Sequence, residues 1–394
     1  MKRLLRISLN VLFTSALPIV SWILLGIIVR PEIADVFSLT YPMQFLFVVL
    51  MAIFAIGANI TAKLKHDKNV VMTNLVVGSI VFGIFTAVIC ANIDAYLEQM
   101  NVTPEVYRDF AIYAFIRIAE GNIIMMISQK LYYKNEIKKT NTINLVYGAC
   151  DFILITVLNS ITDHTAAIII TLCADSAITA IFFFRNYDKW KFSLRLFDNI
   201  KNASFEILDN LGMFLAYGLG YANSFSYGKE FLNAINFETL ITDAQWDMLN
   251  ESVGTAARVD IAERKFNYRK MRRQALAMSA IMLSTSAILG LVLYWYYKPD
   301  LPILLILFGS QVIDMFFDPI NHIRWSYLQI RDNKLRHNAV FVATRLVRIV
   351  CSFIPTGFCV YIGELSSTAI KYIYSRYQCR NFREFKKTKT SSPS

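Results

Sequence analysis

The hydrophobic positions of the chain gather in long runs, and short polar segments separate one run from the next. Each run holds about 17 to 27 mainly apolar residues, a length that lets a helix cross a hydrocarbon core about 30 Å thick. Twelve such runs predict an all-α integral membrane protein with twelve transmembrane helices. Their approximate cores are Leu9 to Val29, Phe37 to Ile60, Asn74 to Ala95, Tyr107 to Ser128, Ile143 to Leu158, Ala166 to Phe184, Ala203 to Phe225, Leu232 to Ala257, Ala275 to Tyr296, Leu301 to His322, Val340 to Tyr361 and Ser366 to Tyr377.

Two similar segments indicate that the runs form two halves. Gly57 to Lys65 spans the end of the second run and leads into basic residues, and Gly254 to Val259 does the same at the end of the eighth run, six runs later. Repeated halves are common in transporter folds, whose binding sites lie where the halves meet. We therefore expect two pseudo-symmetric six-helix lobes, residues 1–190 and residues 191–394, with a basic cytoplasmic tail on the second.

Charge placement gives an orientation. If the N-terminus is cytoplasmic, 32 of the 40 Lys and Arg fall in cytoplasmic segments. Because short cytoplasmic loops collect these residues, we expect a multi-pass protein of the cell (plasma) membrane with both termini in the cytoplasm. These loops and their attraction to anionic headgroups account for the net charge of +11, so we expect membrane lipids and no nucleic acid as partners.

Composition and motifs exclude other classes of protein. Hydrophobic residues make up 55% of the chain and charged residues only 18%, which is not typical of a soluble globule. The four His and six Cys show no metal-ligand spacing, and there is no HExxH, GxSxG or phosphate-loop motif. We expect no enzyme activity, no metal and no cofactor.

The eighth run carries an unusual acidic stretch between Asn236 and Glu251. Asp243, Asp247 and Glu251 recur every four residues, so they share one helix face. Ionisable groups within a membrane are costly unless they face a cavity or a partner, which marks this face as a candidate functional site. The alternative is that the outer part of this helix lies in water.

Other carboxylates lie in neighbouring runs. In the first half, Asp151 and Asp175 could together bind a proton or Na⁺, or each could bond to nearby hydroxyl groups and helix ends. Arg117 and Glu120 are three residues apart and are expected to pair on one helix face. The second half offers four further candidates, Glu206, Asp209, Asp314 and Asp318. Glu206 could instead lie near the cytoplasmic interface.

Short motifs resemble a known family. Thr103-Pro104-Glu105-Val106, followed by Tyr113, resembles the outer loop and fourth helix of MATE transporters, the multidrug and toxic compound extrusion family, which has an Asp-Pro-Glu-Val-like turn there. The segments at Gly57 and Gly254 look like the ends of that family's second and eighth helices. The chain differs in being short and in lacking a carboxylate in its first run, so it resembles an atypical short member of the wider MATE and flippase superfamily.

The resemblance implies a function. A MATE-like protein is expected to be a secondary active transporter that exports organic cations or amphiphilic small molecules by antiport with H⁺ or Na⁺, through alternating access between its lobes. The family's C-lobe cation site draws carboxylates from helices seven and ten, for which Asp209 and Asp314 match best. The alternatives are a flippase for lipid or polyisoprenoid-linked substrates, which the acidic eighth run disfavours, and a non-transporting membrane receptor or scaffold.

Overall fold

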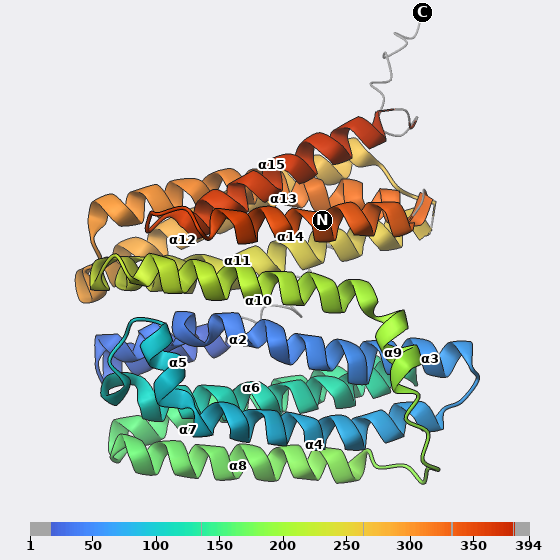
Figure 1. Ribbon diagram of the computed structural model, residues 1–394, viewed down its shortest axis with the longest axis horizontal. Helices are drawn as coiled ribbons and strands as arrows, with labels where there is room; N and C mark the ends of the chain where they lie inside the picture. Colours follow the sequence, from blue (N-terminus) through green and yellow to red (C-terminus); the bar gives the residue numbers. More distant parts are fainter. Residues whose placement is uncertain (1–16, 135, 263, 332–333, 381, 383–394) are drawn as a thin grey trace, which may run out of the picture.

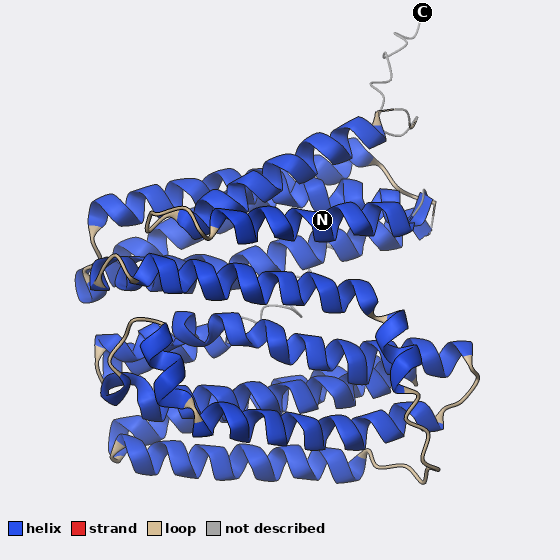
Figure 2. Ribbon diagram, in the orientation of Figure 1, coloured by secondary structure: helices blue, strands red, loops and turns tan. Residues whose placement is uncertain are grey.

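The structure is a computed structural model that describes residues 17–134, 136–262, 264–331, 334–380 and 382. The secondary structure of these residues is helical, with no strand among them (Figure 2). The elements are a first helix Leu17–Ile28, η1 Pro31–Asp35, α2 Val36–Met51, a π-helical segment η2 Ala52–Gly57, α3 Ala58–Leu64, α4 Asn69–Ala91, α5 Ile93–Gln99, α6 Pro104–Tyr133, α7 Ile137–Ile161, α8 His164–Arg185, α9 Leu196–Asn202, α10 Ser204–Phe225, α11 Lys229–Ala262, α12 Tyr268–Tyr297, α13 Leu301–Arg331, α14 Lys334–Cys351 and α15 Cys359–Cys379.

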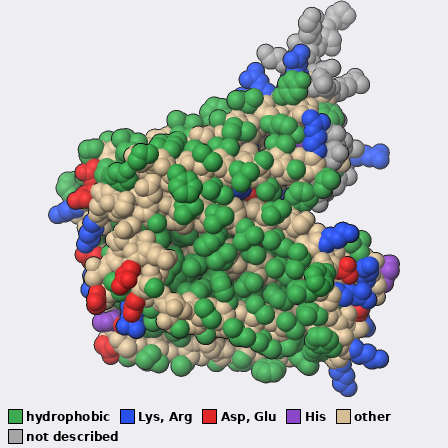
Figure 3. Space-filling view, viewed as in Figure 1, with side chains coloured by type: hydrophobic (Ala, Val, Ile, Leu, Met, Phe, Trp, Pro, Cys, Tyr) green, Lys and Arg blue, Asp and Glu red, His purple; other side chains and the backbone are tan. Residues whose placement is uncertain are grey.

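Apolar helices make this a multi-pass membrane protein. Within the described residues, seven helical stretches are long and apolar enough to cross a bilayer: Pro31–Leu64, Asn69–Ala91, Pro104–Leu131, Lys138–Ile161, His164–Arg185, Tyr268–Tyr297 and Leu301–Ile330. Hydrophobic side chains cover the middle of the face in Figure 3, whereas charged side chains gather at its two ends. Helices overlap every predicted run. Because the helices outside these seven stretches are shorter or more polar, the number of twelve crossings stays a prediction.

One predicted boundary is wrong. The run Val340 to Tyr361 was expected to form a single helix, but α14 ends at Cys351 and α15 begins at Cys359. The segment between them contains Pro355 and Gly357, which interrupt helices because proline lacks an N–H group and glycine is conformationally free. Glu364, which the sequence pattern left in a loop, therefore lies inside a helix.

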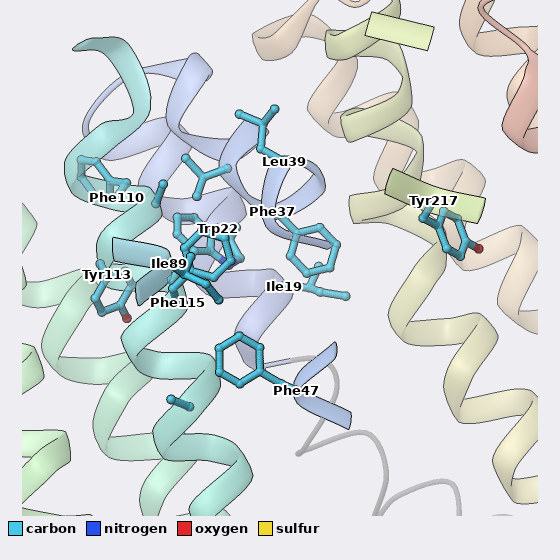
Figure 4. Close-up of a cluster of buried hydrophobic side chains, with 14 of the residues drawn as sticks. Ile19, Trp22, Phe37, Leu39, Phe47, Ile89, Phe110, Tyr113, Phe115 and Tyr217 are labelled. Carbon is cyan, nitrogen blue, oxygen red and sulfur yellow. The ribbon is translucent and has the colours of Figure 1, made fainter. Parts of the chain in front are cut away.

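The helices form two stacked groups (Figure 1). The first group contains Leu17–Ile28 and the helices from α2 to α8, and the second group contains α10 to α15. A large cluster of buried apolar side chains fills the first group, where Trp22, Phe47, Tyr113 and Phe115 lie close together (Figure 4). Tyr217 of the second group joins the same cluster from α10, so the cluster continues across the contact between the groups.

The two groups meet at one end of the molecule, formed by the α10–α11 and α12–α13 turns. Ser38 Oγ donates a hydrogen bond to Asn236 Oδ1 at 3.0 Å, and Lys229 Nζ lies 3.3 Å from Glu32 Oε1. The Tyr297 hydroxyl donates to the Ile23 carbonyl at 2.8 Å. At the opposite end, which carries α9 and the α3–α4 loop, the surface in Figure 3 is notched between the groups. We call this second end the basic end because the α3–α4, α8–α9 and α11–α12 connections, rich in Lys and Arg, lie there.

The connection between the groups, residues 186–203, is fastened to the first group. Asp188 Oδ2 lies 2.8 Å from Lys130 Nζ and 2.6 Å from Lys134 Nζ. Partial burial acts to raise the pKa of the Asp188 carboxyl, but the hydrogen bonds from the two lysines outweigh it and hold that pKa below its usual value. Further along, Ser193 N–H donates to Thr73 Oγ1 at 2.9 Å. We call residues 186–203 the strap.

Candidate functional site

A cavity lies between the helices of the second group and is bounded on one side by Tyr41 of α2. Three acidic side chains and four tyrosines dominate its wall. The lining residues are Tyr41, Tyr217, Tyr221, Glu238, Thr239, Thr242, Gln311, Asp314, Val360, Tyr361 and Glu364. They come from α2, α10, α11, α13 and α15, so both helix groups contribute to the wall.

Glu238 is held on α11 by uncharged donors. Its side chain is 1% exposed, and Thr242, one helical turn later, donates a hydrogen bond to Glu238 Oε1 at 2.7 Å. The Tyr361 hydroxyl donates to Oε2 at 2.6 Å. Because neither donor carries a positive charge, the carboxyl group at this position has to be neutralised by a proton or by a cation from the cavity.

Glu364 on α15 has a different set of partners. Its Oε1 accepts a hydrogen bond from the Tyr217 hydroxyl and lies 3.5 Å from Arg348 Nη1, while Gln311 Nε2 donates to Oε2 at 3.1 Å. Arg348 of α14 is buried and also donates to the Tyr217 hydroxyl at 3.2 Å. Glu364 is therefore paired with a cation, unlike Glu238.

Asp314 and Asp318 lie one turn apart on α13. Asp314 is 2% exposed, and no hydrogen bond from a described residue reaches its Oδ1. Asp318 Oδ2 lies 3.4 Å from His322 Nε2, and Asn321 Nδ2 lies 3.5 Å from its Oδ1. Asp314 lines the cavity, whereas Asp318 lies behind it, towards the basic end of the helix.

Aromatic rings cover the cavity where the two groups meet. The Tyr41 and Tyr217 ring centroids are 5.1 Å apart in an edge-to-face arrangement, and the Phe45 ring stacks on Tyr217 at 5.4 Å. A desolvated cation is attracted to the face of such a ring by about 2 kcal/mol. Three carboxyl groups opposed by one arginine, together with these rings, make the cavity chemically suited to organic cations.

The other predicted residues of the second half lie elsewhere. Asp209 forms a bidentate pair with Arg345, whose Nε and Nη2 lie 2.6 and 3.1 Å from its two oxygens, so it does not join Asp314 at the cavity. Glu206 is exposed in the first turn of α10. Asp243, Asp247 and Glu251 belong to α11, but their side chains lie outside the described residues.

The first group holds a second buried polar cluster. Asp151 pairs with Arg117 of α6 and accepts a hydrogen bond from the Tyr113 hydroxyl at 2.6 Å. Arg117 was expected to pair with Glu120, but it forms an ion pair with Asp151, and Glu120 accepts a hydrogen bond from Ser176 instead. Asp175 is fully buried nearby, and neither of its oxygens has a hydrogen-bond partner among the described residues.

Sequence reasoning missed two of the three acids of the cavity. Glu364 fell between two expected runs, and Glu238 lies in the eighth run but was not among the candidate residues. The helix-breaking pair Pro355 and Gly357 was the available signal, because it places the start of the last helix before Glu364 rather than after it. Nothing in the linear pattern links Glu238 to Tyr361.

Comparisons with known proteins bear on the fold. No protein-family model and no curated protein sequence matches the chain. Its structure is similar to an inward-facing conformation of a multidrug resistance MATE family transporter of the MOP superfamily, with TM-score 0.66 and 14% identity over 93% of this chain and 94% of that one. An outward-facing conformation of such a transporter gives TM-score 0.60 and 14% identity, covering 96% of both chains.

A third structure is a MOP superfamily transporter from Pyrococcus furiosus, for which a binding pocket of reversed polarity suggests a different function. It gives TM-score 0.63 at 15% identity and covers 96% of both chains. The structural neighbours are thus transporters rather than enzymes, and the matches extend over nearly the whole of each chain. The chain therefore has the fold of the MATE transporters of the MOP superfamily, which confirms, at the level of the fold, the family that its Thr-Pro-Glu-Val turn resembles.

Proposed function

We propose that this protein is a secondary transporter that exports organic cations or cationic amphiphiles by alternating access. The observation that carries the proposal is the cavity beside Tyr41, whose wall holds three acidic groups and four tyrosines, and in which, among the described residues, only Glu364 of the three acids pairs with an arginine, Arg348. Buried carboxylates without enough cations favour a positively charged ligand, and aromatic walls accommodate apolar substituents of varied shape. The fold is known in both inward-facing and outward-facing conformations of other transporters, which supports alternating access.

Coupling would follow from competition for the same carboxyl groups. A proton or Na⁺ that neutralises Glu238 or Asp314 removes the negative charge that holds the substrate. Because linkage is reciprocal, the substrate equally lowers the affinity for the coupling ion. The cluster of Asp151 and Asp175 in the first group offers a further position for that ion. This mechanism needs no cofactor besides H⁺ or Na⁺.

The contacts between the groups support an inward-facing state. The hydrogen bonds that join Ser38 to Asn236 and Tyr297 to Ile23 lie at the end opposite the basic end. If the basic end is cytoplasmic, as the charge distribution predicts, the cavity is closed towards the outside in this structure. Both termini would then be cytoplasmic in a plasma-membrane exporter.

The proposal is tested by flux in proteoliposomes with imposed pH or Na⁺ gradients and tetraphenylphosphonium as the probe cation. We expect gradient-driven flux that falls at least about tenfold in Glu238→Gln with Glu364→Gln, since about 1.4 kcal/mol of lost attraction is tenfold. Glu206→Gln is the matched control because Glu206 is exposed and outside the cavity. Flux that ignores the gradient, or that survives in the double variant, would reject the proposal.

The remaining alternatives predict different results in the same assay. A lipid or polyisoprenoid-linked flippase needs cations for its substrate's phosphate groups. Among the described residues no Lys or Arg lines the cavity, and Arg348 beside it is already paired with Glu364. A receptor or scaffold would bind the probe without moving it. Scrambling of a phosphate-bearing lipid, or saturable binding without flux, would favour one of these alternatives.

A further inference from the structure

Arg348 lies beside Glu364, one of the three acids of the cavity. Its side chain is 4% exposed, and Nη1 lies 3.5 Å from Glu364 Oε1 and 3.2 Å from the Tyr217 hydroxyl. Nε donates a hydrogen bond to Ser367 Oγ at 3.0 Å, which fastens the guanidinium to α15. The chain thus carries its own cation at one of the three acids of the cavity.

The partners of Glu364 leave little capacity for a second cation. Oε1 already receives the Tyr217 hydroxyl and faces Arg348, and Oε2 receives Gln311 Nε2 at 3.1 Å. By contrast, Oδ1 of Asp314, in the same cavity wall, has no hydrogen-bond partner among the described residues. A cation that reaches Asp314 therefore finds an oxygen without a hydrogen-bond partner among the described residues, whereas at Glu364 it must compete with Arg348.

The geometry of the pair makes this competition feasible. Charge-assisted hydrogen bonds between guanidinium and carboxylate groups are usually about 2.7 to 2.9 Å long, so a separation of 3.5 Å is a loose contact. A second, smaller cavity lies on the other side of Tyr217 and is lined by Ala216, Tyr217, Arg348, Ser352 and Val360. Arg348 therefore borders this small cavity on one side and Glu364 on the other, so its guanidinium is not packed tightly on every side.

We propose that Arg348 is a tethered internal cation, which neutralises Glu364 when the cavity is empty and withdraws when the positive group of a substrate binds. This inference rests on the proposed function, because it assumes that cations enter the cavity. It assigns Arg348 a role in selectivity. A substrate has to supply its own charge and enough aromatic or apolar contact with Tyr41 and Tyr217 to displace a cation that is already in place.

The test measures the equilibrium affinity of the purified protein for tetraphenylphosphonium at one fixed pH for all variants. Arg348→Gln removes the competitor and is expected to tighten binding about tenfold, whereas Arg348→Lys keeps a charge there and is expected to bind like the wild type. The matched control is Arg345→Gln. This arginine lies on the same helix, but it pairs with Asp209 rather than with an acid of the cavity wall, so its loss should not tighten binding.

A milder variant protects the test against misfolding. Ser367→Ala removes the tether of Arg348 without changing any charge, and it is expected to tighten binding two- to threefold. Unchanged affinity in Arg348→Gln and Ser367→Ala, or equal weakening in Arg348→Gln and Arg348→Lys, would overturn the inference and assign Arg348 a purely structural role. If the wild type itself neither binds nor transports the probe, the proposed function fails instead.

Discussion

At the scale of single residues, the unusual group is Glu238, a buried carboxyl whose hydrogen-bond donors are a threonine and a tyrosine. A hydrogen bond to a charged group contributes about 1.5 to 3 kcal/mol. The Tyr361 hydroxyl therefore favours the ionised form of Glu238, which is the form that attracts a cation. Removing that donor should weaken cation binding even though the carboxyl group stays in place.

We expect Tyr361→Phe to weaken tetraphenylphosphonium binding about tenfold, which follows from the loss of this charge-assisted hydrogen bond. Tyr377→Phe is the control, since Tyr377 lies on the same helix and is 69% exposed. Isothermal titration of both purified variants measures the difference. Equal affinities in the two variants would mean that the Tyr361 hydroxyl does not support the charge of Glu238.

The sequence was least informative about which charged residues pair with each other. The positions of Asp209 and Asp314 in two expected helices were readable, but the pairing of Asp209 with Arg345 joins residues 136 positions apart. A single sequence carries no information on such distant partners. For the same reason the spacing of Arg117 and Glu120 suggested a local pair, while Arg117 pairs with Asp151 of another helix.

At the scale of elements, α9 of the strap packs against the first group through close backbone contact. The Asn199 carbonyl of α9 lies directly against Gly57, so that a Cβ atom on Gly57 would overlap it. Asn199 Nδ2 also donates to Asn74 Oδ1 at 2.8 Å, and Asn202 Nδ2 donates to Thr61 Oγ1 at 2.9 Å. The glycine is needed for this approach and not for any unusual backbone angle.

We expect Gly57→Ala to destabilise the protein by about 1 to 3 kcal/mol, because an added methyl group has no space and α9 must shift. Gly83→Ala is the matched control, since a Cβ atom on that helical glycine meets nothing within 4 Å. The control should be neutral or more stable by about 0.5 to 1 kcal/mol. Thermal unfolding in detergent compares them, and equal melting temperatures would contradict this packing argument.

The strap also gives a pH-dependent stability. A hydrogen bond from Ser193 holds the pKa of the Asp67 carboxyl below its usual value of 3.8, with further help from the N–H group and side chain of Asn69. A lowered folded-state pKa stabilises the protein fully above the unfolded pKa, and this contribution is lost as the pH falls through the lowered value.

We therefore expect Asp67→Ala to lower the free energy of unfolding by about 1 to 2 kcal/mol at pH 7, and the difference from the wild type to shrink as the pH falls below about 4. Thermal unfolding in detergent from pH 7 to pH 3 measures it. A difference that stays constant across this range would show that the charge of Asp67 is not involved.

A helix could be predicted from the sequence where it corresponds to a long apolar run. Long runs indicated the apolar helices correctly, but they concealed the break between Cys351 and Cys359, because Phe353, Ile354 and Phe358 keep the hydropathy high across a segment that is not helical. The π-helical segment Ala52–Gly57 was equally invisible. It packs against α9, a contact that local composition does not reveal.

At the scale of the whole molecule, the two groups are held together at the end opposite the basic end by tyrosines of α12. The Tyr297 hydroxyl donates to the Ile23 carbonyl, and the Tyr296 hydroxyl lies 3.1 Å from both the Gly26 and Ile27 carbonyls. The Gly26 and Ile27 carbonyls lie in the last turn of the first helix, where no intrahelical donor is available. Gly26 lies beneath the Tyr297 hydroxyl, so a side chain there would prevent this contact.

We expect Gly26→Ala and Tyr297→Phe to shift the population towards states that are open at this end. One lost hydrogen bond of about 1 kcal/mol changes a two-state ratio roughly fivefold. Spin-label distances between exposed positions 98 and 227, one in each group, should broaden and lengthen, whereas the Tyr294→Phe control should not change them. Unaltered distances in both variants would show that this contact does not hold the end closed.

The strap has a mechanical consequence for the opposite, basic end. Because α9 is fixed to the first group and α10 begins the second, the covalent joint between the groups is reduced to the buried Ala203 between Asn202 and Ser204. A residue spans at most about 3.6 Å, so the groups cannot separate far beside this joint. Separation of the two groups at the basic end must therefore be asymmetric and must increase with distance from α9. A bulky substrate would enter on the side of the molecule that is remote from α9.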